Sequence, residues 1–198
     1  EADVIADTVN SLLNLEYSDP FSIILIDDGS ADGTAASARA AAASHTDRLD
    51  IVAGMALPEG WSGKVWAMAQ GVSRAAEIAP EARYILFCDA DIVHAPSNLR
   101  RLVARAESAE TDLTSIMVKL AAQGIWERLL IPPFVFFFQM LYPFSHVNRG
   151  RSFAAAGGCM LVRRQTLEAA GGLSGIRGAL IDDCALAALI GRHGGRLW

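Results

Sequence analysis

The sequence predicts a single α/β domain, with a Rossmann-like sheet that is mixed but mostly parallel and is flanked by helices. Short apolar runs at residues 22–26, 49–53 and 84–88, each bounded by polar residues, are typical of buried strands in such a sheet. Segments with helical periodicity alternate with these runs, as in other α/β domains. A chain of 198 residues is long enough to bury one substantial core.

The helices of the first half follow from apolar spacing. A first helix, which Asp3 would cap, has one apolar face made of Ile5, Val9, Leu12 and Leu13. An alanine-rich helix follows the strand at 22–26 up to about residue 43, with Ser30, Asp32 or Thr34 as its cap. A third helix starts at Lys64 and carries Val65, Met68 and Val72 on one side.

The second half continues the alternation. After the strand at 84–88 we expect a helix capped by Ser97 and ending near residue 107, and then a strand at 113–118. A further strand at 154–162 leads to a short helix that ends at Gly171, and a last helix covers 180–190.

Composition limits the function classes. The net charge of −5 argues against a nucleic-acid-binding protein, which would carry a basic face. The three cysteines are odd in number and lie in apolar context, so we expect reduced core residues: Cys88, Cys159 and Cys184. The four histidines lack the spacing of a metal site. There is no signal peptide, and the chain starts without Met and stops at Trp198 in an apparent new strand, so we expect a fragment.

Two carboxylates, Asp89 and Asp91, directly follow the strand at 84–88. Ligands of open α/β sheets bind outside the carboxyl ends of the strands. Hard oxygen donors at this position suit Mg²⁺ or Mn²⁺, which is commonly bound through one or two carboxylates and substrate phosphates. The alternative is an ordinary solvated loop with a helix-capping Asp.

Two further acidic pairs stand at the ends of predicted elements. A helix-capping turn explains Asp32 and Thr34, but not why Asp27 and Asp28 directly follow the strand at 22–26. A third pair, Asp182–Asp183, opens the last helix, where helix capping is the simpler explanation.

Three other features point to a ligand. The connection 54–63 is long for a strand-to-helix loop, and it ends at Lys64, whose charge opposes the helix dipole. An anionic partner would hold this lysine in place; a solvated side chain is the alternative. Gly157 and Gly158 lead into the strand at 154–162, so the backbone there can approach a ligand closely.

Residues 129–144 carry no charge but include three prolines. The run is short for a membrane span and its prolines oppose one straight helix, so we expect an interfacial or re-entrant segment, with core packing as the alternative. Arginines at 128, 149 and 151 favour contact with anionic headgroups.

Phosphate-loop, nucleophile-elbow and dinucleotide motifs are absent from the sequence. The acidic motifs at 27–34, 89–91 and 182–183, in this order, resemble those of family-2 inverting glycosyltransferases of GT-A fold. Residues 1–3 resemble the tail of that family's opening strand motif, whose preceding part is not in this sequence. The loop at 60–64, the stretch at 156–163 and the proline–aromatic segment look most like the ceramide-glucosyltransferase-like branch, and within it the hopanoid-biosynthesis-associated enzymes.

The resemblance implies a donor site. Asp28 would hydrogen-bond the uracil of a UDP-sugar, and Asp27 would support it. Asp91 would ligate the metal that bridges the diphosphate, Asp89 would contact the ribose or metal-bound water, and Lys64 would lie near the diphosphate.

It also implies an acceptor site on a membrane. Gly157 and Gly158 would line the acceptor and sugar pocket, and Asp183 would be the general base, although Asp182 stands where the family usually has Glu. The reaction would be an in-line displacement that inverts the anomeric carbon of the sugar and transfers it to a lipid hydroxyl, at the cytoplasmic face of the plasma membrane. The alternatives are a haloacid-dehalogenase-like phosphatase, suggested by residues 87–93, and an inactive membrane-surface binding domain.

Overall fold

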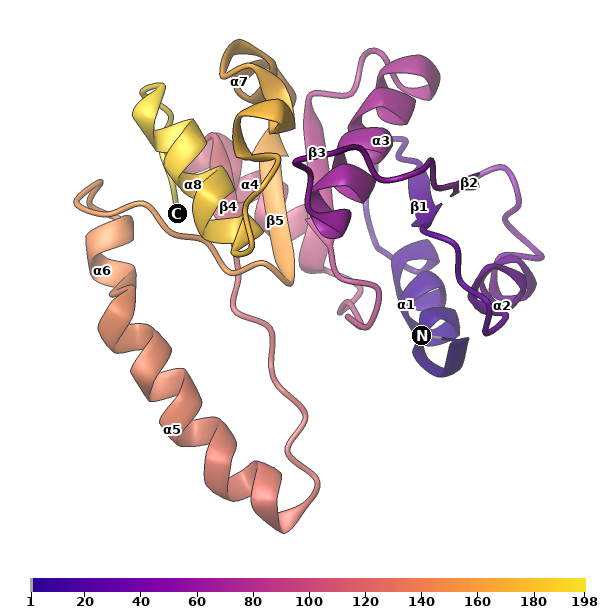
Figure 1. The fold of residues 1–198 in the computed structure, drawn as a ribbon, viewed down its shortest axis with the longest axis horizontal. Helices are drawn as coiled ribbons and strands as arrows, with labels where there is room; N and C mark the ends of the chain where they lie inside the picture. Colours follow the sequence, from indigo (N-terminus) through magenta and orange to yellow (C-terminus); the bar gives the residue numbers. More distant parts are fainter. Residues whose placement is uncertain (1) are drawn as a thin grey trace.

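The computed structural model describes residues 2–198 and has a mixed α/β architecture with a protruding helical arm (Figure 1). Its first half contains α1 (Ala2–Leu13), β1 (Ile23–Asp27), α2 (Thr34–Ala41), β2 (Leu49–Ala53) and α3 (Gly63–Ile78). Its second half contains β3 (Tyr84–Cys88), α4 (Asn98–Ala109), β4 (Leu113–Ser115), α5 (Ile125–Leu141), α6 (Phe144–Val147), β5 (Cys159–Arg163), α7 (Arg164–Ala169), the 3₁₀ helix η1 (Gly172–Ile176) and α8 (Asp182–Arg192). The predicted α/β class is confirmed.

Strands β1 and β2 form a parallel pair in which Ile23 lies opposite Leu49. One face of the pair packs against α1 and α2 through a cluster that includes Ile5, Val9 and Ala38. Helix α3 lies against β1 and also contributes Val65 to the core under β5. Because α3 packs on both sheets, its first residues lie where the two sheets meet.

Strands β3, β5 and β4 form a second sheet in that order, and both of its pairs are antiparallel. The expectation that residues 84–88 pair in a parallel manner is therefore wrong for this strand. An apolar run shows that both faces are covered, but it carries no information about the direction of the neighbouring strand. Leu86 faces a cluster with α4, and Ile85 and Phe87 face the opposite cluster with α8.

Helix α1 fastens the loop that follows β3. The Thr8 hydroxyl donates to the Ala90 carbonyl at 2.8 Å, and the His94 amide donates to Ser11 Oγ at 2.9 Å. Asp3 lies within the helix rather than capping it, and the Ala2 amide donates to Asp32 instead. The motif predicted at residues 1–3 includes Glu1, which lies outside the described residues.

Among the described residues, β1 pairs only with β2, and β3 pairs only with β5. Each of these strands therefore has one unpaired edge. The expectation that a further, opening strand belongs to this sheet stays a prediction.

Helix α5 stands apart from the rest of the domain, at the end of an extended arm formed by residues 116–124 (Figure 1). Pro132 and Pro133 lie inside this single helix, and the third proline of the segment, Pro143, precedes α6. None of its residues is buried, which excludes the core-packing alternative. Within the described chain, Ile125–Val147 is the one helical stretch long and apolar enough to cross a membrane, judged by length and composition alone.

Candidate active site

The first acidic pair ends β1 beneath the loop at 54–63. The Asp27 carboxylate accepts the Ser30 amide at 3.0 Å and so shapes the turn. Asp28 is exposed, and a Cβ on Gly54 would lie 3.1 Å from its Oδ1. A Cβ on Gly63 would lie 3.8 Å from its Oδ2, so the two ends of the loop close around this carboxylate.

Lys64, in the first turn of α3, pairs with one carboxylate that follows β3 and with one at the start of α8. Its Nζ lies 2.7 Å from Asp89 Oδ1 and 3.4 Å from Asp182 Oδ2. Burial tends to lower the pKa of Lys64, but the hydrogen bond to Asp89 and the charge of Asp182 outweigh it, so the pKa is raised and the ammonium is retained. Within the described chain, the anionic groups that hold this lysine at the start of α3 are Asp89 and Asp182, and its predicted place near a diphosphate stays a prediction.

The two acids at the start of α8 differ in environment. Asp182 is buried, and its Oδ2 accepts no hydrogen bond within the described chain although Lys64 is its ion-pair partner. Asp183 is half-buried; its Oδ2 accepts the Gly157 amide at 2.9 Å and its Oδ1 accepts the Cys184 amide at 2.7 Å. Asp182 therefore belongs to the lysine cluster, whereas Asp183 faces the segment before β5.

The two glycines before β5 lie in close contact with other side chains. A Cβ on Gly157 would lie 3.0 Å from Asp183 Oδ2, and a Cβ on Gly158 would lie 3.0 Å from a Val118 methyl. The space above both residues is thus occupied by this chain's own side chains. Their predicted role as pocket lining stays a prediction.

Residues that sequence patterns did not single out hold the loop at 54–63. Buried Gln70 accepts the Met55 amide at 2.7 Å, and the Trp66 indole donates to the Met55 carbonyl at 3.1 Å. The Ser62 amide donates to the Arg177 carbonyl at 2.7 Å, which ties the loop to the segment before α8. The available signal was the pair Trp66 and Gln70, which are four residues apart and therefore share one face of α3.

A model of the family described as "Glycosyl transferase family 2" matches residues 1–171. The chain belongs to glycosyl transferase family 2. A comparison with curated proteins gives no match. The family assignment removes the support for the phosphatase alternative, and the predicted recognition of a family-2 glycosyltransferase is confirmed at this level.

Two solved structures share the fold of this family-2 domain. One is the mannosyltransferase PcManGT from Pyrobaculum calidifontis in complex with GDP-Man and Mn²⁺, with 20% identity, a TM-score of 0.72, and 100% of this chain covering 50% of that one. The other is TarS from S. aureus in complex with UDP, with 15% identity, a TM-score of 0.57, and 93% of this chain covering 50% of that one. The chain thus spans about half the length of these structures, and it has the predicted GT-A fold.

The carboxylates suit a divalent cation, although no group of three His, Cys, Asp or Glu side chains able to hold one occurs among residues 2–198. Asp91 is exposed and lacks a hydrogen-bond or ion-pair partner in the described chain, and the buried Asp182 Oδ2 accepts no hydrogen bond. Lys64 places a positive charge between Asp89 and Asp182. Two or three hard oxygen donors completed by diphosphate oxygens are a suitable set for Mg²⁺ or Mn²⁺.

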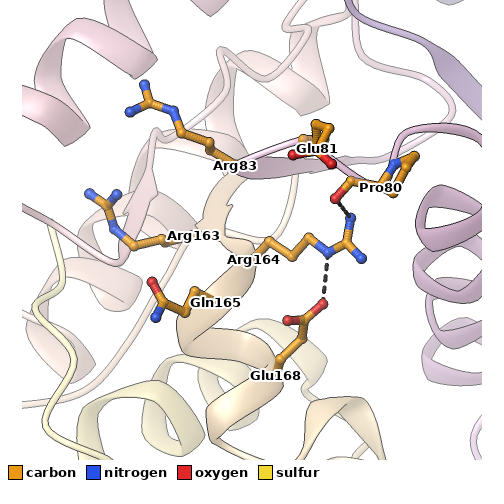
Figure 2. A pocket seen from close by; sticks show the side chains of 8 residues that line it. Pro80, Glu81, Arg83, Arg163, Arg164, Gln165 and Glu168 are labelled. Carbon is orange, nitrogen blue, oxygen red and sulfur yellow. Dashed lines mark hydrogen bonds and ion pairs between the residues drawn. The ribbon is translucent and has the colours of Figure 1, made fainter.

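A separate hollow of about 250 Å³ lies at the opposite end of β3 and β5 (Figure 2). Arg164 donates there to the Pro80 carbonyl at 2.9 Å and pairs with Glu168 at 2.7 Å. Arg83 pairs with Glu107 on α4, so these guanidinium groups are already engaged. The hollow therefore lies between the end of α3 and the start of α7, and it is separate from the acidic site.

Proposed function

We propose that this family-2 domain transfers a sugar from a UDP-sugar to the hydroxyl of a lipid acceptor, with inversion at the anomeric carbon and with Mg²⁺ or Mn²⁺. The observation that carries the proposal is the meeting of Lys64, Asp89 and Asp182 beside the base candidate Asp183. Within the family we place the domain in the ceramide-glucosyltransferase-like, hopanoid-associated branch, on the sequence motifs given above.

The donor would lie across the ends of β1 and β3. Asp28 is solvent-exposed and lies next to both ends of the loop at 54–63, so it is placed to hydrogen-bond the base of the nucleotide. Asp27 fixes the turn that follows β1. Lys64 is placed to meet the diphosphate. Asp89 and Asp91 would hold the cation, which when bound offsets negative charge on the diphosphate leaving group.

Asp183 is the better candidate for the general base. It is half-buried, so an acceptor hydroxyl can reach it, whereas Asp182 is buried and engaged with Lys64. Two backbone amides hold the Asp183 carboxylate in one orientation, as proton abstraction in line with sugar transfer requires. Asp182 then positions Lys64 and does not take the proton.

Helix α5 supports a membrane-borne acceptor at the cytoplasmic face of the plasma membrane. Its Trp126, Phe136 and Phe137 side chains are each more than half exposed. Exposed apolar surface of this kind marks an interaction site, and aromatic side chains are favoured at the headgroup level. Neighbouring arginines at 128, 149 and 151 suit anionic headgroups.

The test is transfer by the full-length protein, in vesicles of phosphatidylglycerol and phosphatidylethanolamine, from UDP- and GDP-sugars to a long-chain alcohol with Mn²⁺. We expect product from a UDP-sugar, with inverted configuration, and loss of product with EDTA. Product from GDP-sugars alone would refute the donor assignment. Binding of UDP without turnover on lipid or soluble acceptors would instead support the inactive binding domain.

A further inference from the structure

An apolar groove of about 510 Å³ runs between α5 and the extended arm that precedes it. Residues 117–120 of the arm form one wall. The other wall includes Ile131, Val135 and Gln139, which recur every four residues and therefore share one face of α5. This face is about 12 Å long at the rise of an α-helix.

Both walls of the groove lead to residues close to Asp183, the proposed base. On the arm, the Val118 methyls contact Gly158 so closely that a Cβ there would lie 3.0 Å from one of them. The amide of the neighbouring Gly157 donates to Asp183. At the end of α5, Tyr142 packs against the same core cluster as Cys184, the residue that follows Asp183. The end of the groove at Val118 therefore lies next to the glycine segment that binds Asp183.

The groove is lined mainly by apolar side chains, and the polar side chains among its lining residues are Lys119 and Gln139. The far side of the same helix is apolar and exposed as well, at Trp126 and Phe137 among others. If the outer face of α5 lies in a lipid surface, the groove on its inner face is open to molecules at the same depth in that surface. Hydrocarbon can enter such a groove without passing through water.

We propose that this groove holds the hydrocarbon part of the acceptor and presents its hydroxyl to Asp183. The inference rests on the proposed lipid acceptor and adds the site that selects it. A hydrocarbon fits better than a peptide, because a peptide would bring polar backbone groups into a groove with few polar side chains to pair with them.

The test uses the full-length protein in vesicles of phosphatidylglycerol and phosphatidylethanolamine with a diazirine-bearing C16 alcohol as probe. Val135→Trp fills the groove, and Leu130→Trp, on the exposed outer side of the same helix, is the matched control. We expect crosslinks within residues 117–120 and 131–139, reduced about tenfold by Val135→Trp and unchanged by Leu130→Trp. A tenfold loss corresponds to contact with roughly two methylene groups.

Vesicle binding should be the same for both variants, which separates acceptor binding from membrane attachment. Met117→Trp fills the groove from the arm and should act like Val135→Trp even if one variant unfolds. The groove proposal would be overturned if crosslinks occurred only on the outer face of α5. It would also be overturned if neither groove-filling variant changed labelling or transfer. In both cases sugar transfer to a lipid would remain the proposed function. Groove labelling without transfer to any lipid alcohol would refute the proposed function instead, and protection of the groove by a peptide but not by lipid would assign it to a protein partner.

Discussion

Removal of the Lys64 charge should tighten the binding of a divalent metal in the absence of nucleotide. The ammonium lies between Asp89 and Asp182, where it neutralises oxygen atoms that a metal would use. Lys64→Met keeps the length of the side chain and removes this competing cation. The same variant should weaken the binding of UDP in the presence of Mn²⁺, because the diphosphate then loses a positive partner.

The size of the effect follows from the exposure of the three side chains. Lys64 is 49% exposed, Asp89 37% and Asp182 13%, so water screens both ion pairs substantially. Exposed pairs contribute up to about 1 kcal/mol each. Two such pairs give about 1 to 2 kcal/mol, or about a 5- to 30-fold lower Kd for Mn²⁺.

Titration of Mn²⁺ followed by electron paramagnetic resonance, with and without UDP, measures both effects. Lys119→Met, which removes the other lysine of the chain, is the matched control and should leave Mn²⁺ affinity unchanged. In an Asp182→Asn background the gain from Lys64→Met should shrink, since one of the two pairs is already lost. Unchanged or weaker Mn²⁺ binding by Lys64→Met without UDP would refute the reasoning.

Four further predictions test other parts of the site. Asp183→Asn should lower kcat for transfer by about 10²–10⁴ with UDP binding intact, whereas near-normal transfer would assign the base elsewhere. Gly157→Ala should cost about 1–3 kcal/mol in urea unfolding, because its Cβ would stand 3.0 Å from Asp183 Oδ2; unchanged stability would contradict this packing. Phe137→Asp should weaken vesicle binding and raise the KM for the lipid while UDP binding persists, because Phe137 is 56% exposed, and unchanged vesicle binding by this variant would contradict a membrane role for α5. Burial lowers the pKa of His94, so below about pH 6.5 the unfolded state binds a proton more readily than the folded state, and the free energy of unfolding falls as the pH drops. His94→Gln should flatten this pH dependence in thermal unfolding. An identical pH profile for the variant would show that His94 is not its cause.

The positions of most elements were determined by local sequence. The bounds of β2 and β3 coincide with their apolar runs, and α8 begins at the acidic pair at 182–183. These features are visible in sequence because strand and helix periodicity involve neighbours only a few residues apart. Two strand boundaries differ from the prediction: β4 ends at Ser115, where the chain leaves the sheet as the extended arm, and β5 begins only at Cys159, after the small residues at 154–158.

Tertiary structure decided the direction of strand pairing and the division of labour within the acidic pairs. The antiparallel pairing of β3 with β5 and the ion pairs of Lys64 with Asp89 and Asp182 join segments that are distant in sequence. Local sequence also did not show that α5 continues as one helix through Pro132 and Pro133, because an internal proline removes a helical hydrogen bond. Sequence thus determined which chemical groups stand at the strand ends, while packing between distant segments determined that Asp182 holds Lys64 and that Asp183 remains accessible.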